Sequence, residues 1–393
     1  MASRHRIVVV GASLAGLSVA ESLRLEGFSG EILLVGDESH LPYSRPPLSK
    51  QVLLDDWEPE RSILKSTHEL EELGIEFRGS TTATGLDTGN RMVITDNGVE
   101  HYDDVVIATG TRARRVWDRA GVLTLRTLDD ATAMRSELRR AGRVAVLGAG
   151  VLGSEIASAA RRLGGDVTLI GRSGRISFGA VGTALSARLS DLHRENGVDL
   201  RLATTVLDIA TGIGGTQVGF DDGTGVSADV VISAIGGIPR TEWLTGSGLI
   251  LADGVVCDHR GVAAPGVYAV GDVAAWADPA TGIASRVEHQ SSAIEQAMAV
   301  ATTILHDRES ATPVPFFWSE IHGARIKAYG WFAAQHPLVE LDAGSQDGSV
   351  LLGSQEDGRT RGVIAWNLPP QAFRKARGLV DSAVPVLDSH AKV

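Results

Sequence analysis

Two stretches of the chain repeat one hydrophobic pattern: a short apolar run, a glycine-rich turn, an amphipathic segment and a second apolar run. The first copy has its apolar runs at residues 7–10 and 31–35. The second copy has them at 143–147 and 166–170. Short apolar runs bounded by glycine are typical of buried parallel strands. Each copy therefore predicts a strand, a turn, a helix and a strand.

Both turns carry the glycine spacing that binds dinucleotides. In this unit the glycines allow a tight turn and let the backbone approach a pyrophosphate, which the N-terminus of the following helix stabilises. One match is weak, but two matches in the same strand–turn–helix context favour a pair of dinucleotide-binding folds over chance turn glycines. The motif residues are Gly11, Ser13, Leu14, Ala15 and Gly16 in the first copy, and Gly148, Gly150, Val151, Leu152 and Gly153 in the second.

The two copies differ in the residue offered to the ribose. In the first copy Ser13 replaces the middle glycine, and Asp37 follows the second strand, where a carboxylate accepts hydrogen bonds from ribose hydroxyls. In the second copy the strand runs into Gly171 and Arg172, with Arg175 just beyond. An arginine attracts the 2′-phosphate that a carboxylate repels, which favours NADPH, or use of both nicotinamides, over strict use of NADH. The alternative is that these arginines are solvated loop charges.

Further apolar runs indicate how the two folds are connected. One strand is expected at 104–110 between the copies, another at 228–236, and a third at 266–272. This order predicts α/β architecture with two Rossmann-like domains, one inserted in the other. Past Phe316 the pattern changes to short strands, near 325–332, 338–341, 350–352 and 362–366, and a helix near 370–380, which predicts a small α+β C-terminal domain. The expected boundaries are 1–112 and 241–316 for the first dinucleotide-binding domain, 113–240 for the second and 317–393 for the third.

Composition narrows the class of protein. The 393 residues include 37 Lys and Arg against 48 Asp and Glu, a formal net charge of −11, with 43% hydrophobic residues. This composition is typical of soluble globular proteins and gives no general attraction to nucleic acid, and no apolar run approaches the roughly 20 residues of a membrane helix. A cytoplasmic protein is expected. The single cysteine, Cys257, excludes an intramolecular disulfide, a thiolate metal cluster and a redox cysteine pair. It lies in a strand pattern at 255–258 and is most simply a buried small hydrophobe.

The most specific motif is Leu-Pro-Tyr-Ser-Arg-Pro-Pro-Leu-Ser-Lys at 41–50. Together with 108–110, 125–130, 269–274 and 315–319, it resembles the FAD-dependent NAD(P)H:ferredoxin reductases, the family of putidaredoxin reductase and biphenyl dioxygenase ferredoxin reductase among the glutathione-reductase-like flavoproteins. The resemblance covers nearly the whole chain. It implies that the first domain binds FAD and that the second binds NADH or NADPH. No metal site is implied.

The resemblance also implies roles for single residues. Lys50 is expected beside flavin N5, where a fixed positive charge stabilises reduced flavin, and Glu155 is expected to pair with it. The alternatives are a surface lysine and a glutamate that favours a helix N-terminus. Trp318 is expected near the flavin on the partner side, or in the core, and His289 either tunes the flavin or simply starts a helix. The other residues expected at the cofactors are Asp37, Arg45, Ala83, Ala108, Thr109, Gly110, Arg126, Arg172, Gly236, Gly271, Asp272, Glu288 and Gln290.

These features predict an enzyme of the EC 1.18.1 class that passes hydride from NAD(P)H to FAD and then single electrons to a [2Fe-2S] or similar ferredoxin, which serves an oxygenase or a cytochrome P450. A monomer or weak homodimer is expected. Acidic ferredoxins require a local basic surface. Alternatives on the same scaffold are an NAD(P)H oxidase, a rubredoxin reductase and a redox-signalling protein that binds nicotinamide and flavin. The candidate docking residues, which are otherwise a solvated basic face, are Arg325, Lys327, Arg374, Lys375 and Arg377.

Overall fold

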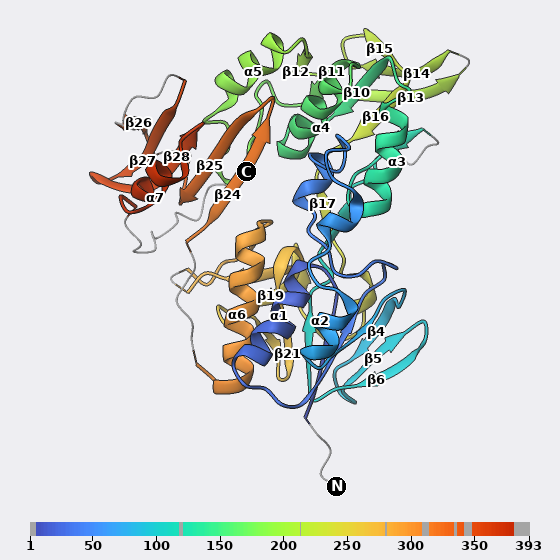
Figure 1. Cartoon of the computed structure of the whole chain (residues 1–393), viewed down its shortest axis with the longest axis vertical. Helices are drawn as coiled ribbons and strands as arrows, with labels where there is room; N and C mark the ends of the chain where they lie inside the picture. Colours follow the sequence, from blue (N-terminus) through green and yellow to red (C-terminus); the bar gives the residue numbers. More distant parts are fainter. Residues whose placement is uncertain are drawn as a thin grey trace.

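The computed structural model of the chain has three parts (Figure 1). In the view of Figure 1 the first dinucleotide-binding unit lies below, the second lies above, and a sheet of C-terminal residues stands beside the second. None of the helices that the structure describes is long and apolar enough to cross a membrane. The described residues are 5–117, 121–212, 214–279, 281–308, 314–333, 336–341 and 348–380.

The first unit is built on a six-stranded sheet in the order β20-β21-β7-β1-β2-β3. Its central strand β1 (Arg6–Val10) pairs in parallel with β2 (Glu31–Val35) and β7 (Asp104–Ile107). Residues 7–10 are buried because helices cover the sheet, which explains their uninterrupted apolar run. The remaining elements of this unit are α1 (Leu14–Leu25), α2 (Thr67–Glu72), β3 (Ile75–Arg78), β20 (Val262–Ala264), β21 (Val267–Ala269) and α6 (Gln290–His306).

The second unit repeats this arrangement in a five-stranded sheet of order β12-β11-β10-β16-β9. Strand β10 (Arg143–Leu147) pairs in parallel with β11 (Asp166–Gly171) and β16 (Val230–Ser233). The predicted strand–turn–helix repeat is confirmed, since α4 (Val151–Arg162) follows the second glycine turn as α1 follows the first. The other elements are β9 (Val122–Leu123), α3 (Leu128–Leu138), α5 (Ser186–Glu195) and β12 (Asp199–Leu202).

The chain crosses between the two units twice, and the crossings lie side by side. Strand β8 (Thr111–Ala113) leads out of the first unit and pairs antiparallel with β17 (Gly237–Pro239), which leads back. The predicted α/β fold, with one dinucleotide-binding unit inserted in the other, is therefore confirmed. The residue boundaries assigned to the domains stay a prediction.

The C-terminal part is a five-stranded antiparallel sheet in the order β24-β25-β28-β27-β26. Its first strand, β24 (Phe316–Ile321), was not among the predicted strands, although it contains most of the motif at 315–319. Phe316, Phe317 and Trp318 are consecutive aromatics, so alternation of apolar and polar residues, the usual signal of a strand, is missing there. The other elements are β25 (Ala324–Gly330), β26 (Leu338–Leu341), β27 (Val350–Glu356), β28 (Arg359–Trp366) and α7 (Pro370–Arg377).

Three smaller sheets were also not predicted from the sequence, although the strand expected around Cys257 is confirmed. Two are three-stranded antiparallel ribbons, and one is a four-stranded sheet that extends the first unit. Their strands are short and lie between turn residues, and several combine exposed and buried positions without a clear period of two. The strands are β4 (Ala83–Asp87), β5 (Met92–Thr95), β6 (Gly98–His101), β13 (Val206–Gly212), β14 (Gly215–Phe220), β15 (Gly225–Ala228), β18 (Leu251–Ala252), β19 (Gly254–Cys257), β22 (Ala274–Ala277) and β23 (Ala284–Arg286).

Candidate dinucleotide-binding and electron-transfer site

A cleft of about 1810 Å³ is lined by residues of both dinucleotide-binding units and of β24. It runs along the carboxyl ends of the central strands, the place where open α/β sheets bind ligands. Nearly all residues predicted at the cofactors line it. The four that do not are Gly11, Gly16, Gly153 and Ala83. Gly11 packs against the Ala108 backbone, and Gly16 and Gly153 pack within α1 and α4 against the first glycine of each turn. Ala83 is in β4, so its predicted contact with adenine stays a prediction.

The two glycine turns have the same backbone geometry. Gly11 and Gly148 have φ values of 116° and 112°, and a Cβ added to them would lie 2.2 Å from the Ala108 carbonyl oxygen and 2.3 Å from the Ala234 carbonyl oxygen, respectively. A side chain cannot be placed in either position without moving the backbone. Each turn therefore brings bare backbone and the N-terminus of α1 or α4 to the cleft, which suits the pyrophosphate of a dinucleotide.

Arg45 and Arg126, on the first-unit side of the cleft, are each paired with a carboxylate. Arg45 donates from Nη2 to Glu38 Oε1 (2.7 Å) and from Nη1 to the Arg126 carbonyl oxygen (2.5 Å). Arg126 in turn donates from Nη2 to Asp272 Oδ2 (2.9 Å). The Tyr43 hydroxyl donates to Glu38, and burial raises the pKa of Tyr43 above its ordinary value, so this donor stays protonated. The network fixes Arg45 beside the first glycine turn.

The predicted ribose carboxylate also has a partner. Arg240 Nη1 donates to Asp37 Oδ2 at 2.5 Å, and the Arg240 carbonyl oxygen accepts from Thr109 Oγ1 at 2.9 Å. Because Arg240 directly follows β17, the returning crossover sets the orientation of Asp37.

The pair predicted from the family resemblance forms at the centre of the cleft. Lys50 Nζ lies 2.7 Å from Glu155 Oε1, and the residues are only 8% and 6% exposed. Lys50 is therefore not a surface lysine, whereas Glu155 does lie near the N-terminus of α4, as its alternative interpretation expected. Two buried hydroxyls complete the cluster. Ser49 Oγ donates to Glu155 Oε2 and Ser319 Oγ donates to Glu155 Oε1, both at 2.5 Å.

This cluster joins the three parts of the molecule. In the first unit Ser49 ends the short helix Pro46–Ser49 and Lys50 directly follows it. Glu155 comes from α4 of the second unit and Ser319 from β24. A buried ion pair is stable only when its remaining hydrogen-bonding capacity is satisfied. Here both oxygens of Glu155 accept hydrogen bonds, which holds the Lys50 ammonium at a fixed place.

Aromatic side chains form the wall of the cleft on the C-terminal side. The Trp318 ring lies 5.1 Å from Lys50 Nζ and is 37% exposed, so it is not an ordinary core aromatic. Phe317 packs edge-on against both Phe178 (5.3 Å) and His289 (5.5 Å between ring centroids). Burial lowers the pKa of His289, partly offset by Asp272 and Glu288, and its side chain makes no cap hydrogen bond to α6. Whether His289 tunes the flavin stays a prediction.

Five residues of the site were missed by reasoning from the sequence: Glu38, Tyr43, Ser49, Arg240 and Ser319. Four of them lie in or beside the motifs at 41–50 and 315–319, so the motifs contained the signal. Arg240 had no such signal because its partner Asp37 is distant in sequence and meets it only through the crossover.

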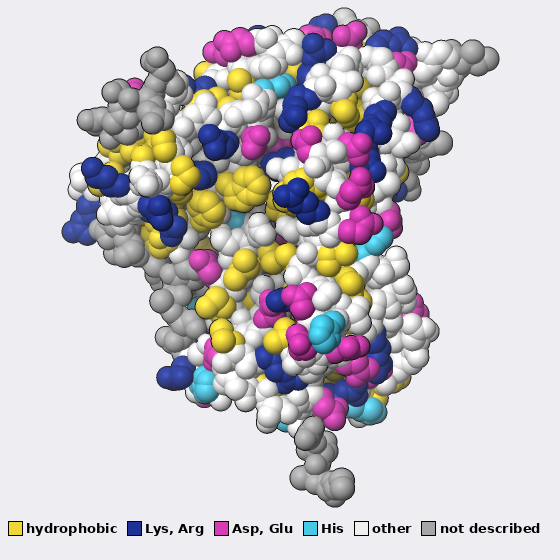
Figure 2. Space-filling view, viewed as in Figure 1, with side chains coloured by type: hydrophobic (Ala, Val, Ile, Leu, Met, Phe, Trp, Pro, Cys, Tyr) yellow, Lys and Arg dark blue, Asp and Glu magenta, His cyan; other side chains and the backbone are white. Residues whose placement is uncertain are grey.

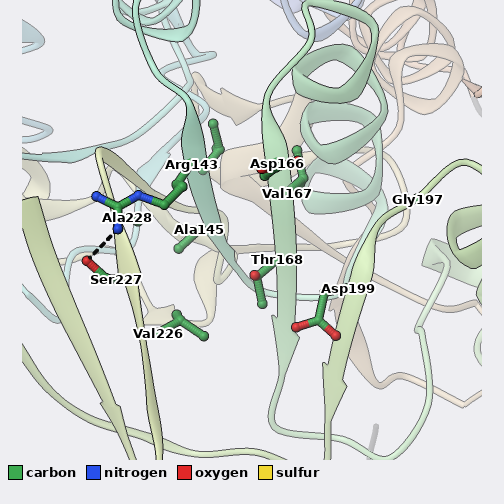
Figure 3. A pocket seen from close by; sticks show the side chains of 11 residues that line it. Arg143, Ala145, Asp166, Val167, Thr168, Gly197, Asp199, Val226, Ser227 and Ala228 are labelled. Carbon is green, nitrogen blue, oxygen red and sulfur yellow. Dashed lines mark hydrogen bonds between the residues drawn. The ribbon is translucent and has the colours of Figure 1, made fainter.

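A second, smaller pocket of about 450 Å³ lies at the beginning of β10, β11 and β12, away from the carboxyl ends of these strands (Figure 3). Arg143 at its edge donates to Ser227 Oγ (3.0 Å) and pairs with Asp229 (2.7 Å). None of the residues predicted at the cofactors lines this pocket.

Cys257 is distant from this chemistry. It is buried in β19, and burial raises the pKa of its thiol to about 12, which confirms the expectation of a small buried hydrophobe.

Comparison with known proteins identifies a family and several similar proteins. Residues 5–297 match the family model of the pyridine nucleotide-disulphide oxidoreductases. The chain is 36% identical over 386 residues to the ferredoxin–NAD(+) reductase subunit of the benzene 1,2-dioxygenase system of Pseudomonas putida (97% of this chain, 93% of the relative). It is 31% identical over 398 residues to putidaredoxin reductase of Pseudomonas putida (98% and 94%).

A solved structure shows the same fold. The reductase in the crystal structure of the covalent putidaredoxin reductase–putidaredoxin complex matches with a TM-score of 0.89 and 29% identity, over 96% of this chain and 93% of that chain. The chain belongs to the pyridine nucleotide-disulphide oxidoreductase family, in the group of ferredoxin reductases that serve bacterial oxygenase systems.

Proposed function

We propose that this protein is an FAD-dependent NAD(P)H:ferredoxin oxidoreductase that supplies electrons to a ferredoxin of an oxygenase or cytochrome P450 system. The observation that carries the proposal is the buried Lys50–Glu155 pair, which stands between the two glycine turns and against β24. We assign a flavin dinucleotide to the first turn and a nicotinamide dinucleotide to the second, so Lys50 and Glu155, which line the same cleft as both turns, would adjoin both cofactors. When bound, FAD accepts a hydride from the nicotinamide and releases electrons one at a time.

The residues present fit FAD in the first unit. Gly11 lets the turn pack closely against the Ala108 carbonyl, and the turn residues Ser13, Leu14 and Ala15 line the cleft, where a pyrophosphate would meet the N-terminus of α1. Asp37 can accept from the ribose, and Lys50 supplies a fixed positive charge. A preorganised charge at a developing anion is usually the largest contribution of a protein to such a step. Glu155, Ser49 and Ser319 contribute by holding that charge in place.

The outward route for electrons runs through β24. Trp318 faces Lys50 on one side and is partly exposed, and it pairs across the sheet with Lys327 of β25. Lys327 Nζ lies 5.4 Å from the ring of Phe373 in α7, whose last turn carries Arg374, Lys375 and Arg377. Lys and Arg side chains also gather over the C-terminal sheet in Figure 2. An acidic ferredoxin is expected to dock on this basic face beside Trp318, weakly and with strong salt dependence.

The proposal is tested by anaerobic stopped-flow in two steps. The FAD-loaded protein is first mixed with NADH or NADPH while flavin absorbance is followed, and the reduced protein is then mixed with a [2Fe-2S] ferredoxin. Fast bleaching in the first step and reduction of the ferredoxin in the second are expected. Lys50→Met should slow the first step roughly 10- to 100-fold. Lys65→Met, which removes a lysine outside the cleft that pairs with Glu21, is the matched control and should leave the rate unchanged.

Two results would overturn the proposal. Failure of both nucleotides to bleach the flavin at a useful rate would favour a redox-signalling protein. Rapid bleaching followed by reaction with oxygen but not with any ferredoxin would favour an NAD(P)H oxidase.

A further inference from the structure

Because the two units share one backbone arrangement, each position of the second unit can be compared with its equivalent in the first. Gly36 directly follows β2 and Gly171 ends β11, and the pairing register with β1 and β10 makes them equivalent. A Cβ added to either would lie 2.7 Å from the Cβ of Ala12 or Ala149, respectively. These alanines are themselves equivalent, because each follows the first glycine of its turn. The residue after Gly36 is Asp37, so the position equivalent to the ribose carboxylate of the first unit is occupied by Arg172 in the second.

The segment that carries Arg172 is fixed by the backbone around it. The Gly171 carbonyl oxygen accepts from Thr204 N and the Ser173 carbonyl oxygen accepts from Ala203 N, both at 3.0 Å. Ser177 N donates to the Ala149 carbonyl oxygen at 3.1 Å, which ties the segment to the glycine turn itself. Arg172 is therefore held at a defined distance from the turn rather than carried on a free loop.

The charges of this segment are exposed to the cleft and uncompensated. Arg172 and Arg175 both line the cleft and are exposed. Within the described part of the chain, neither guanidinium has a hydrogen-bond or ion-pair partner, in contrast to Arg45, Arg126 and Arg240 across the cleft. Among the residues that the structure describes between 166 and 206, no Asp or Glu lines the cleft. This end of the cleft is thus suited to an anion.

We propose that Arg172, supported by Arg175, binds the 2′-phosphate of NADPH and makes NADPH the preferred hydride donor. The inference rests on the proposed function and names its donor. Guanidinium groups bind phosphate oxygens through two charge-assisted hydrogen bonds, and a nicotinamide without the 2′-phosphate would leave both arginines unpaired. The absence of a carboxylate beyond β11 also removes the group that would bind the ribose hydroxyls of NADH and repel the phosphate.

The test compares binding and reduction for four forms of the FAD-loaded protein: the native chain, Arg172→Ala, Arg172→Asp and Arg201→Ala. The last removes an arginine of β12 that pairs with Asp199 and does not line the cleft, and is the matched control. Binding of 2′,5′-ADP and of 5′-AMP is measured by calorimetry, which needs no turnover. The rate constant and apparent Kd of flavin reduction are measured with NADPH and with NADH.

The native chain is expected to bind 2′,5′-ADP at least about 10-fold more tightly than 5′-AMP, since hydrogen bonds to charged groups are each worth roughly that factor. Arg172→Ala should remove most of this difference and raise the apparent Kd for NADPH more than the apparent Kd for NADH. Arg172→Asp should reverse the preference, and Arg201→Ala should resemble the native chain.

The proposal would be overturned if the native chain bound 2′,5′-ADP and 5′-AMP equally, or if the ratio of these affinities were unchanged in Arg172→Ala. In that case a fast reaction with NADH would still support the reductase function. If neither nicotinamide reduces the flavin, the proposed function fails, yet the calorimetric ratio still decides whether the phosphate site exists.

Discussion

The two dinucleotide-binding units share one backbone frame and differ in the side chains set on it. In both units the first glycine has φ near 115°, a Cβ at that glycine would strike a carbonyl of the neighbouring strand, and a parallel sheet buries an apolar first strand. At the end of the second strand the first unit presents Asp37, whose charge Arg240 compensates, and the second presents Arg172, whose charge has no partner in the described chain.

This contrast separates two kinds of information. The glycine turn and the helix N-terminus suit any dinucleotide, because both interact with the pyrophosphate and not with the groups attached to it. The identity of the dinucleotide depends on one or two side chains at the strand end. Paired charges in the first unit suit a tightly held cofactor, and unpaired arginines in the second suit a substrate that binds and leaves.

The largest effect is expected when the shared frame is broken on one side only. Gly11→Ala should abolish FAD retention, because its Cβ would lie 2.2 Å from the Ala108 carbonyl oxygen at a positive φ. Gly148→Ala should retain FAD, but the rate of flavin reduction by NAD(P)H should fall by more than about 100-fold. A displaced turn weakens binding of the nicotinamide dinucleotide and also misaligns it. The FAD-to-protein absorbance ratio and anaerobic reduction rates measure the two losses.

Gly150 provides the control for this pair. Nothing lies within 4 Å of a Cβ added there, and the first unit has Ser13 at the equivalent position. Gly150→Ser should therefore fold and retain FAD with a melting temperature close to native. Loss of FAD in Gly148→Ala would contradict the assignment of separate dinucleotides to the two units.

A second effect concerns the carboxylate that distinguishes the first unit. Asp37→Asn should weaken FAD binding about 10-fold, because a charged acceptor is lost from the ribose and the Arg240 guanidinium is left without its partner. Titration of the apoprotein with FAD measures the change. Asp129→Asn, an exposed aspartate paired with His40, is the control and should bind FAD normally. Equal FAD affinity in all three forms would place the ribose elsewhere.

Much of the shared backbone of the two units could be predicted from the sequence, because its elements are contiguous along the chain. Strand, glycine turn and helix occupy one continuous stretch in each unit, so periodicity and glycine spacing predicted β1, β2, β10 and β11 within about one residue. The motif at 41–50 likewise led to Lys50. Arg240 was missed because its role depends on a contact with Asp37, 203 residues away, for which local pattern carries no signal. Strand β24 was missed because its consecutive aromatics lack the alternation of apolar and polar residues.

Ser319 allows a smaller test of how the third part supports the two units. Ser319→Ala removes one of the two hydroxyls that hold Glu155 and should slow hydride transfer about 3- to 10-fold, because the Lys50 charge is less well fixed. A purely structural role would lower the free energy of unfolding but leave the flavin reduction potential unchanged, so both are measured. Ser354→Ala is the control, since Ser354 is equally buried in the same sheet and does not contact Glu155.

The smallest effect at neutral pH lies where the second unit meets the C-terminal sheet. His193 of α5 and His322 of the β24–β25 turn are 3.0 Å apart (Nδ1 to Nε2), and Ser158 Oγ accepts from His322 N. Burial, with His322 adjacent, lowers the pKa of His193 to about 3, and burial, with Arg161 nearby, lowers the pKa of His322 to about 4. The first unit has no such pair in the described contact between α1 and α6, which is formed by apolar and small side chains.

The histidine pair should make the stability of the second unit sensitive to acid. Between about pH 6.5 and 3 the unfolded chain binds a proton that folded His193 does not, so stability rises with pH in this window and is lost as pH falls. At pH 5 the loss is roughly 2 kcal/mol relative to pH 7.5. Urea unfolding at both pH values should show His193→Gln to be less pH-dependent than the native chain. His68→Gln, in exposed α2, should retain the native dependence, and an equal slope in all three forms would assign the acid sensitivity to other groups.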